Sequence, residues 1–238
     1  MKKPVKRSLI ALAIIAGILI LISAGLFLRF YLGTRNMKPA ETSIVNDSVS
    51  CIKDRFVNAF LFKGENGYLM VDAGNSEQTV QAELEKLGIN PDQVNTLLLT
   101  HTDGDHIGAV GLFKNIRIYM DKEEEQMING KNGKFFFLRT IWKYGPYILL
   151  NDNDTLTLNG WKVKVFHTPG HTPGSCCYLI GKDYLVTGDN LAYHDGKFEH
   201  FISVFNMNTP EQEASIKKLP PLDSIKYILT AHYGVIRH

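Results

Sequence analysis

Four residues of the metal-binding types lie within six positions of the chain. They are His101, Asp103, Asp105 and His106. Imidazole and carboxylate groups are the ligands that borderline and hard divalent metals accept, and nearby Gly104 and Gly108 allow a tight turn. The segment therefore indicates a metal site, although an Asp-rich turn with histidines capping a helix would have the same composition.

Three further residues of these types follow at separate places, each next to a short run that predicts a strand. They are His171, Asp189 and His232. The first group itself follows the apolar run Val94 to Leu99, which predicts a buried strand. Open α/β sheets usually place their sites on loops at the C-terminal ends of strands. Four strand ends therefore offer ligands of the kind that metals bind.

These motifs and their order resemble the metallo-β-lactamase superfamily, over residues 44–238 and including the turn Val71-Asp72-Ala73-Gly74. In that family the ligand loop normally reads His-x-His-x-Asp-His and binds two metals. The resemblance implies that Asp189 bridges two metal ions and that Asp72 supports the ligand loop by a hydrogen bond. It also implies two ligand sets: His101, Asp103 and His171 for the first metal, and Asp105, His106 and His232 for the second.

Asp103 departs from the family pattern, because it stands where the second histidine is expected. A carboxylate adds a negative charge to the first metal's ligands and makes them harder, which favours manganese or iron over zinc. We expect two divalent ions and rank zinc ahead of manganese and iron as their identity. Asp103 is expected to be a ligand of the first ion, which would be bound weakly. The alternative is that Asp103 points to solvent and leaves only His101 and His171 there.

The resemblance implies an α/β fold, a four-layer αββα sandwich, and a hydrolase. Its two metals would share a bridging hydroxide that attacks an ester, lactone, lactam, thioester or phosphoester of a small molecule. Asp105 would orient the hydroxide, and Tyr193 and Tyr233 could donate hydrogen bonds to an oxyanion. Two alternatives remain: di-iron redox chemistry, as in flavodiiron proteins, whose fused flavodoxin-like domain has no counterpart here, and a non-catalytic metal-binding or ligand-sensing domain.

Residues 8–28 are apolar apart from Ser8 and Ser23, and a helix of this length would span about 30 Å of hydrocarbon. A cleaved signal peptide is the competing interpretation, but its apolar core would be unusually long and Ile22-Ser23-Ala24 is a poor cleavage site. We therefore expect a basic cytoplasmic tail (1–7), a transmembrane anchor in the lipid bilayer (8–28), a linker (29–40) and a metallo-hydrolase domain (41–238).

Basic residues flank the apolar segment on both sides. Lys2, Lys3, Lys6 and Arg7 precede it, and Arg29, Arg35 and Lys38 follow it. The first cluster, with the free amino group, favours a cytoplasmic N-terminus. We expect a single-pass protein of the cell membrane with its catalytic domain outside the cytoplasm.

The charge of the chain argues against nucleic-acid binding. The chain has 26 Lys and Arg and 24 Asp and Glu, and residues 1–35 contain six of the basic and none of the acidic ones. The remainder has 26 − 6 = 20 basic residues against 24 acidic ones, so it lacks the basic surface that nucleic acids require. The sequence predicts no oligomeric state.

Two local patterns give weaker expectations. Residues 129–153 form an aromatic, poorly periodic stretch that we interpret as a helix-containing insertion packed on the core, a substrate-facing wall, a lid, or a patch facing the membrane. Neighbours on a strand point to opposite faces, so at most one of Cys176 and Cys177 is expected to face the core.

Overall fold

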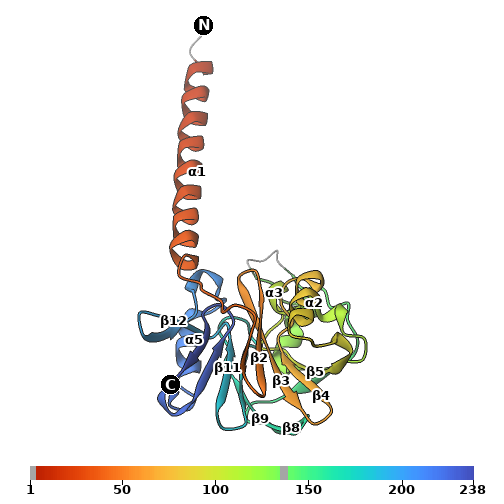
Figure 1. Cartoon of the computed structure of the whole chain (residues 1–238). Coiled ribbons are helices and arrows are strands. Elements are labelled where there is room, and N and C mark those ends of the chain that lie inside the picture. The colour runs from red at the N-terminus through yellow and green to blue at the C-terminus, as the bar shows by residue number, and fades with distance from the viewer. Residues whose placement is uncertain (1–3, 135–138) are drawn as a thin grey trace. The chain divides into compact units, whose positions relative to one another are not determined.

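The computed structural model describes residues 4–134 and 139–238. The chain divides into two compact units, Met1–Asn36 and Met37–His238 (Figure 1). The first unit contains a long helix, and the second contains all the strands. The second unit therefore carries the whole of the predicted hydrolase domain.

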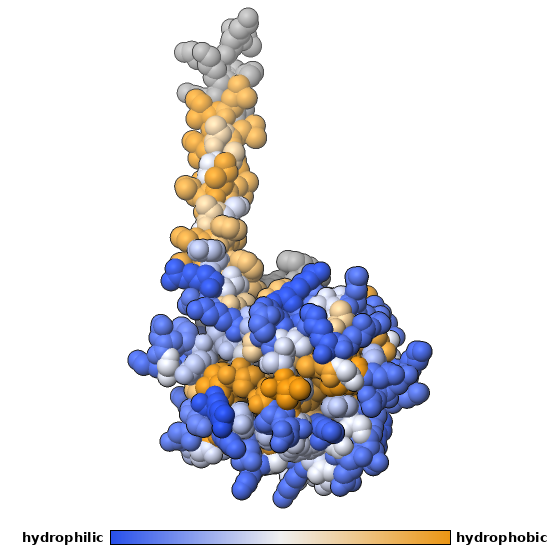
Figure 2. Space-filling model, viewed as in Figure 1, coloured by the Kyte–Doolittle hydropathy of each residue, from blue (hydrophilic) through white to orange (hydrophobic). Residues whose placement is uncertain are grey.

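Helix α1 (Pro4–Thr34) is long and apolar enough to cross a membrane over Leu9–Thr34, with a mean hydropathy of 2.9. None of its most apolar stretch is buried, and apolar side chains cover its visible face (Figure 2). It is the only such helix among the described residues. The helix continues past residue 28 to Thr34, so the first part of the predicted linker is helical.

The first sheet has seven strands, ordered in space as in the chain. Strands β1 to β4 pair antiparallel, whereas β4 to β7 pair parallel. Helix α2 (Glu77–Lys86) connects β4 to β5, and the short helices α3 (Gly104–Ile107) and α4 (Glu125–Ile128) come later. The strands are β1 (Ser43–Asn46), β2 (Val49–Asp54), β3 (Val57–Gly64), β4 (Gly67–Val71), β5 (Val94–Leu98), β6 (Arg117–Asp121) and β7 (Tyr147–Leu150).

The second sheet has six strands in the order β15-β14-β11-β10-β9-β8, and β12 and β13 form a separate hairpin. Only β11 and β14 pair parallel within it, and α5 (Thr209–Ile216) comes between β13 and β14. The strands are β8 (Thr155–Leu158), β9 (Trp161–His167), β10 (Cys176–Ile180), β11 (Tyr184–Gly188), β12 (Leu191–His194), β13 (Lys197–His200), β14 (Tyr227–Thr230) and β15 (Gly234–Arg237). Single 3₁₀ turns lie at Pro91–Gln93, Val110–Leu112, Lys122–Glu124, Ser203–Phe205 and Leu222–Ser224.

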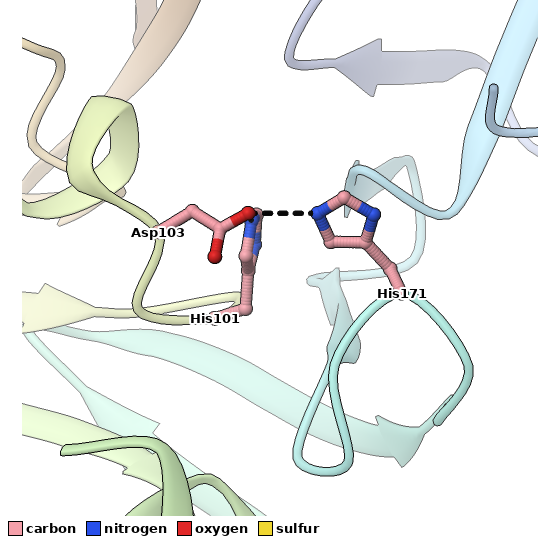
Figure 3. Close-up of side chains that lie close together, drawn as sticks. All are labelled: His101, Asp103 and His171. Carbon is pink, nitrogen blue, oxygen red and sulfur yellow. Dashed lines mark hydrogen bonds and ion pairs between the residues drawn. The ribbon is translucent and has the colours of Figure 1, made fainter. Parts of the chain in front are cut away.

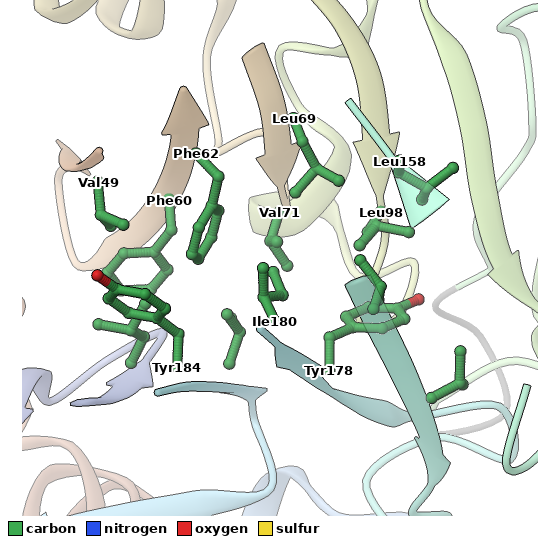
Figure 4. Close-up of a cluster of buried hydrophobic side chains, with 14 of the residues drawn as sticks. Val49, Phe60, Phe62, Leu69, Val71, Leu98, Leu158, Tyr178, Ile180 and Tyr184 are labelled. Carbon is green, nitrogen blue, oxygen red and sulfur yellow. The ribbon is translucent and has the colours of Figure 1, made fainter. Parts of the chain in front are cut away.

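Three apolar clusters hold four layers together. The central cluster lies between the sheets, where Phe60, Phe62 and Leu69 of the first sheet point toward Tyr178, Ile180 and Tyr184 of the second (Figure 4). A second cluster joins the outer face of the first sheet to α2, and a third joins the outer face of the second sheet to residues from α5 onward. Burial of this apolar area is the main stabilising contribution. The predicted αββα sandwich is confirmed.

Two local expectations were wrong or only partly right. Cys176 and Cys177 are both fully buried, because both faces of β10 are covered: one lies in the central cluster and the other in the third. Within residues 129–153, Tyr147–Leu150 is the edge strand β7, and Trp142 and Tyr144 pack against the second cluster. This supports core packing for that part, while Phe135–Leu138 lies outside the described residues.

Candidate metal centre

The ends of parallel strands from both sheets carry the predicted ligands. Asp72 follows β4, and His101 follows its parallel neighbour β5, while Asp189 follows β11 and His232 follows its parallel neighbour β14. His171 lies on the loop between β9 and β10. Parallel strands end at the same edge of a sheet, so these loops meet where the edges of the two sheets face each other.

The structure brings all seven predicted ligands together, with Asp189 between two groups. Its Oδ1 lies 3.4 Å from His106 Nε2 and 3.0 Å from His232 Nε2. Its Oδ2 lies 3.3 Å from His171 Nε2 and 3.9 Å from His101 Nε2. One carboxylate thus faces two ligand groups, a first group of His101, Asp103 and His171 and a second group of Asp105, His106 and His232.

Every histidine of the two groups presents Nε2 to the centre, because Nδ1 has a partner outside it. His106 Nδ1 donates to Asp72 Oδ2 at 2.9 Å, and His232 Nδ1 donates to the Phe56 carbonyl at 2.7 Å. His171 Nδ1 lies 3.1 Å from Asn206 Oδ1, and His101 Nδ1 lies 3.1 Å from Thr100 Oγ1. Such partners fix the tautomer and ring orientation that a ligating imidazole needs.

The second group fits a divalent metal. His106 Nε2 and Asp189 Oδ1 are buried and have no hydrogen-bond partner, which would be costly unless a cation satisfied them, and His101 Nε2 of the first group is in the same state. Asp105 Oδ2 completes the set, at 3.8 Å from His106 Nε2 and 3.6 Å from His232 Nε2. Its side chain is 20% exposed, so this group can be reached from solvent.

The first group is arranged differently, because a lysine reaches it. Asp103 and His101 come from the same loop, and His171 Nε2 lies 3.1 Å from Asp103 Oδ2 (Figure 3). The ammonium of Lys134 donates to Asp103 Oδ2 and lies 2.7 Å from His171 Nε2. Asp103 therefore points inward and pairs with a lysine, an arrangement that neither interpretation of the sequence included.

Charges in the centre shift its acid–base equilibria. Burial alone would lower the pKa of His106, but the carboxylates of Asp72, Asp189 and Asp105 raise it well above the ordinary value. Asp189 and Asp105 likewise raise the pKa of His232 against the effect of burial. Burial opposes ionisation of Asp189 too, yet the neighbouring imidazoles hold its pKa well below the usual range.

Metal binding should accordingly depend on pH. The raised pKa values favour the protonated forms of His106 and His232, and a metal must displace those protons. We expect apparent affinity to fall on acidification, by about tenfold per pH unit for each displaced proton, and to level off above the raised pKa values. Titration calorimetry in two buffers with different ionisation heats measures the protons released. An apparent affinity that did not change on acidification, with no proton release on binding, would contradict this expectation.

Glu124 is an important residue of the centre that sequence analysis missed. It is fully buried, and its Oε1 accepts hydrogen bonds from Thr102 N and Thr102 Oγ1, at 2.8 and 2.7 Å. Its Oε2 accepts from Thr172 Oγ1 at 2.6 Å and from Gly174 N at 3.1 Å. A Cβ at Gly174 would lie 2.0 Å from Glu124 N, so only glycine permits this approach. Glu124 thus joins the loop of His101 to the loop of His171.

The two predicted oxyanion donors differ in position. Tyr193 packs against Phe198, with ring centroids 4.7 Å apart, and against the third apolar cluster. Burial, with Asp189 as a further cause, raises the pKa of Tyr233 to about 12, so its hydroxyl keeps its proton. Tyr233 directly follows His232 in the chain and is close enough to Asp189 for that charge to affect its pKa, so we keep it as the candidate hydrogen-bond donor to substrate.

A two-sheet sandwich that gathers histidines and aspartates at the strand ends of both sheets defines a class of metal-binding proteins. Within that class, the sequence model of the metallo-beta-lactamase superfamily matches residues 52–232. The chain belongs to the metallo-β-lactamase superfamily.

The sequence is similar to enzymes with hydrolase names. It is 30% identical to a hydroxyacylglutathione hydrolase of Aeromonas hydrophila over 190 residues, which cover 78% of this chain and 63% of that enzyme. It is 26% identical to a probable metallo-hydrolase of Bacillus subtilis over 143 residues, which cover 56% of this chain and 65% of the relative. The chain therefore spans less than two thirds of the length of either relative.

Solved structures share the fold. A beta-lactamase from Chitinophaga pinensis superposes with a TM-score of 0.64 at 19% identity, covering 82% of this chain and 78% of that one. The Rm3 metallo-beta-lactamase superposes with a TM-score of 0.65 at 18% identity, covering 84% and 80%. At these identities the likeness concerns the fold alone.

Proposed function

We propose that this chain is a metal-dependent hydrolase that cleaves an acyl bond of a small molecule, with thioesters as the first substrate class to test. The observation that carries the proposal is the second ligand group with Asp189, where the buried His106 Nε2 and Asp189 Oδ1, neither with a hydrogen-bond partner, lie next to the partly exposed Asp105. Thioesters come first because one relative is named a hydroxyacylglutathione hydrolase.

The roles of the residues follow from their positions. A divalent metal, zinc before manganese or iron, would lower the pKa of a water and polarise the scissile carbonyl. His106, His232, Asp105 and the Oδ1 oxygen of Asp189 would hold it. Asp105, the most exposed of these, would also accept a hydrogen bond from the attacking water and orient it. Tyr233 would donate to the oxygen that gains charge.

The test is a substrate panel with the purified full-length chain in detergent. Thioesters, esters, lactones, lactams and phosphodiesters are assayed after the protein has been stripped of metal and reloaded with zinc, manganese or iron. We expect turnover of an acyl substrate that disappears on metal removal and returns on reloading. A metal-loaded chain that hydrolyses no acyl substrate, or only phosphodiesters, would contradict the proposal.

We also propose that α1 anchors the protein in the cell membrane, with the N-terminus inside and residues 41–238 outside the cytoplasm. Support comes from the apolar, unburied stretch Leu9–Thr34 and from the basic residues before it. The protein should sediment with membranes, and protease added to spheroplasts should digest the domain. A domain protected until the spheroplasts are lysed would reverse the orientation, and release of the protein into the soluble fraction would contradict the anchor.

A further inference from the structure

Lys134 reaches the first ligand group from the segment between α4 and β7. Only 7% of the residue is exposed, and its ammonium contacts two of the three members of the group, Asp103 and His171. Long charged side chains are almost never buried to this extent unless they are paired. The pairing with Asp103 satisfies that requirement.

Lys134 competes with a metal for the same ligand atoms. An imidazole nitrogen has one lone pair, and because His171 Nδ1 is directed at Asn206 Oδ1, only Nε2 is available toward the centre. That lone pair accepts from Lys134 at 2.7 Å, and the same ammonium bonds Asp103 Oδ2. A metal could bind His171 only after the lysine had left Nε2, and at Asp103 it would share the carboxylate with the ammonium on Oδ2.

The charges of the two groups also favour metal binding at the second group. The first group contains one carboxylate, Asp103, and its charge is balanced by Lys134. Asp189 faces both groups, so the difference lies in Asp105 of the second group, which pairs with no lysine or arginine within residues 4–134 and 139–238. A divalent cation is therefore attracted to the second group, whereas at the first it would meet a lysine ammonium at close range.

We propose that Lys134 takes the place of the first metal, so that the chain binds one divalent ion, at Asp105, His106, His232 and Asp189. This inference depends on the proposed function in one respect, which is that both place the metal at these four residues. It also accounts for the departure at position 103, because a carboxylate there gives Lys134 a counter-ion that a neutral histidine could not supply. Asp189 would then face the metal through Oδ1, while its Oδ2 lies 3.3 Å from His171 Nε2, the atom that accepts from Lys134.

The first test counts metal ions in the unchanged full-length chain in detergent. The metal-free protein is incubated with excess zinc, passed through a desalting column and measured by elemental analysis, and a cadmium-113 sample is examined by NMR. We expect one ion per chain and one cadmium resonance. Two ions, or two cadmium resonances, would overturn the proposal.

The second test removes the lysine. Lys134→Met keeps the length and removes the charge, and combining it with Asp103→His gives the first group three histidines. We expect the double variant to bind two ions per chain. The matched control is Lys131→Met, an exposed lysine of the same segment, which should leave the count at one. A folded double variant that still binds one ion would overturn the role of Lys134, and if it does not fold, the cadmium spectrum of the unchanged chain decides.

The metal count does not depend on turnover, so the two proposals fail separately. One ion per chain without hydrolysis of any substrate would contradict the proposed function and leave the inference about Lys134 intact. Two ions per chain with metal-dependent hydrolysis would contradict the inference about Lys134 and leave the proposed function intact.

Discussion

Replacing Asp189 with alanine should weaken metal binding by more than about 100-fold and reduce kcat/KM at least as much. The Oδ1 oxygen of Asp189 is the carboxylate atom nearest to both His106 Nε2 and His232 Nε2, at 3.4 and 3.0 Å. Loss of a partner outside the ligand shell already costs about 10–100-fold in metal affinity, so loss of a ligand should cost more. Metal affinity is measured by competition with a chelator, and kcat/KM on the best substrate of the panel.

The fold should survive this substitution. Asp189 is held through its backbone carbonyl, which accepts from Gln212 Nε2 at 2.8 Å, and alanine keeps that contact. Asp92→Ala, at an exposed aspartate in a 3₁₀ turn away from the centre, serves as the control and should change neither quantity. An Asp189→Ala variant that kept its metal affinity would remove Asp189 from the ligand set.

Replacing Asp105 with asparagine should lower kcat by about 100-fold or more, which is the scale expected when a positioned acid–base or electrostatic group is lost. The side chain keeps its shape but can no longer take a proton from the attacking water. Asp105 is partly exposed and lies 3.6 Å from His232 Nε2, so it can act on the water as well as on the metal.

Metal content measured on the same Asp105→Asn sample separates these two roles. A large loss of turnover with the metal retained assigns Asp105 to the chemical step, whereas joint loss of metal and turnover makes it chiefly a ligand. Glu123→Gln, at an exposed carboxylate after β6, is the matched control. Unchanged turnover with full metal content would show that Asp105 has no part in the mechanism.

Much of the fold, and the seven candidate ligand residues that the structure brings together, could be predicted because their signals are local. An apolar run such as Val94 to Leu99 predicts its strand, and the ligands follow directly in the chain. The motifs also occur in the order typical of the family, and this resemblance implied that their loops meet. The pairing of β4 with β5 and of β11 with β14 then brings the ligand loops to one place.

Lys134 and Glu124 could not be predicted in this way. Lys134 lies in a segment without periodicity, and its long side chain reaches ligands that are distant in sequence. Glu124 is the second of three consecutive glutamates, and only the tertiary structure shows that it is the buried one. The expectation for Cys176 and Cys177 failed because it assumed that one face of β10 is open, whereas both faces are packed.

Glu124 has a consequence for the motions of the centre. Its carboxylate accepts the amide of Thr102, on the loop that follows a strand of the first sheet, and the amide of Gly174, on a loop of the second. Neither amide can exchange its hydrogen with solvent unless the bond to this buried group opens, and opening disturbs loops from both sheets. Loops usually exchange quickly, but these two amides should exchange as slowly as those of the central strands. The ligand loops then belong to the last part of the domain to open, and they hold the ligands in place before a metal arrives.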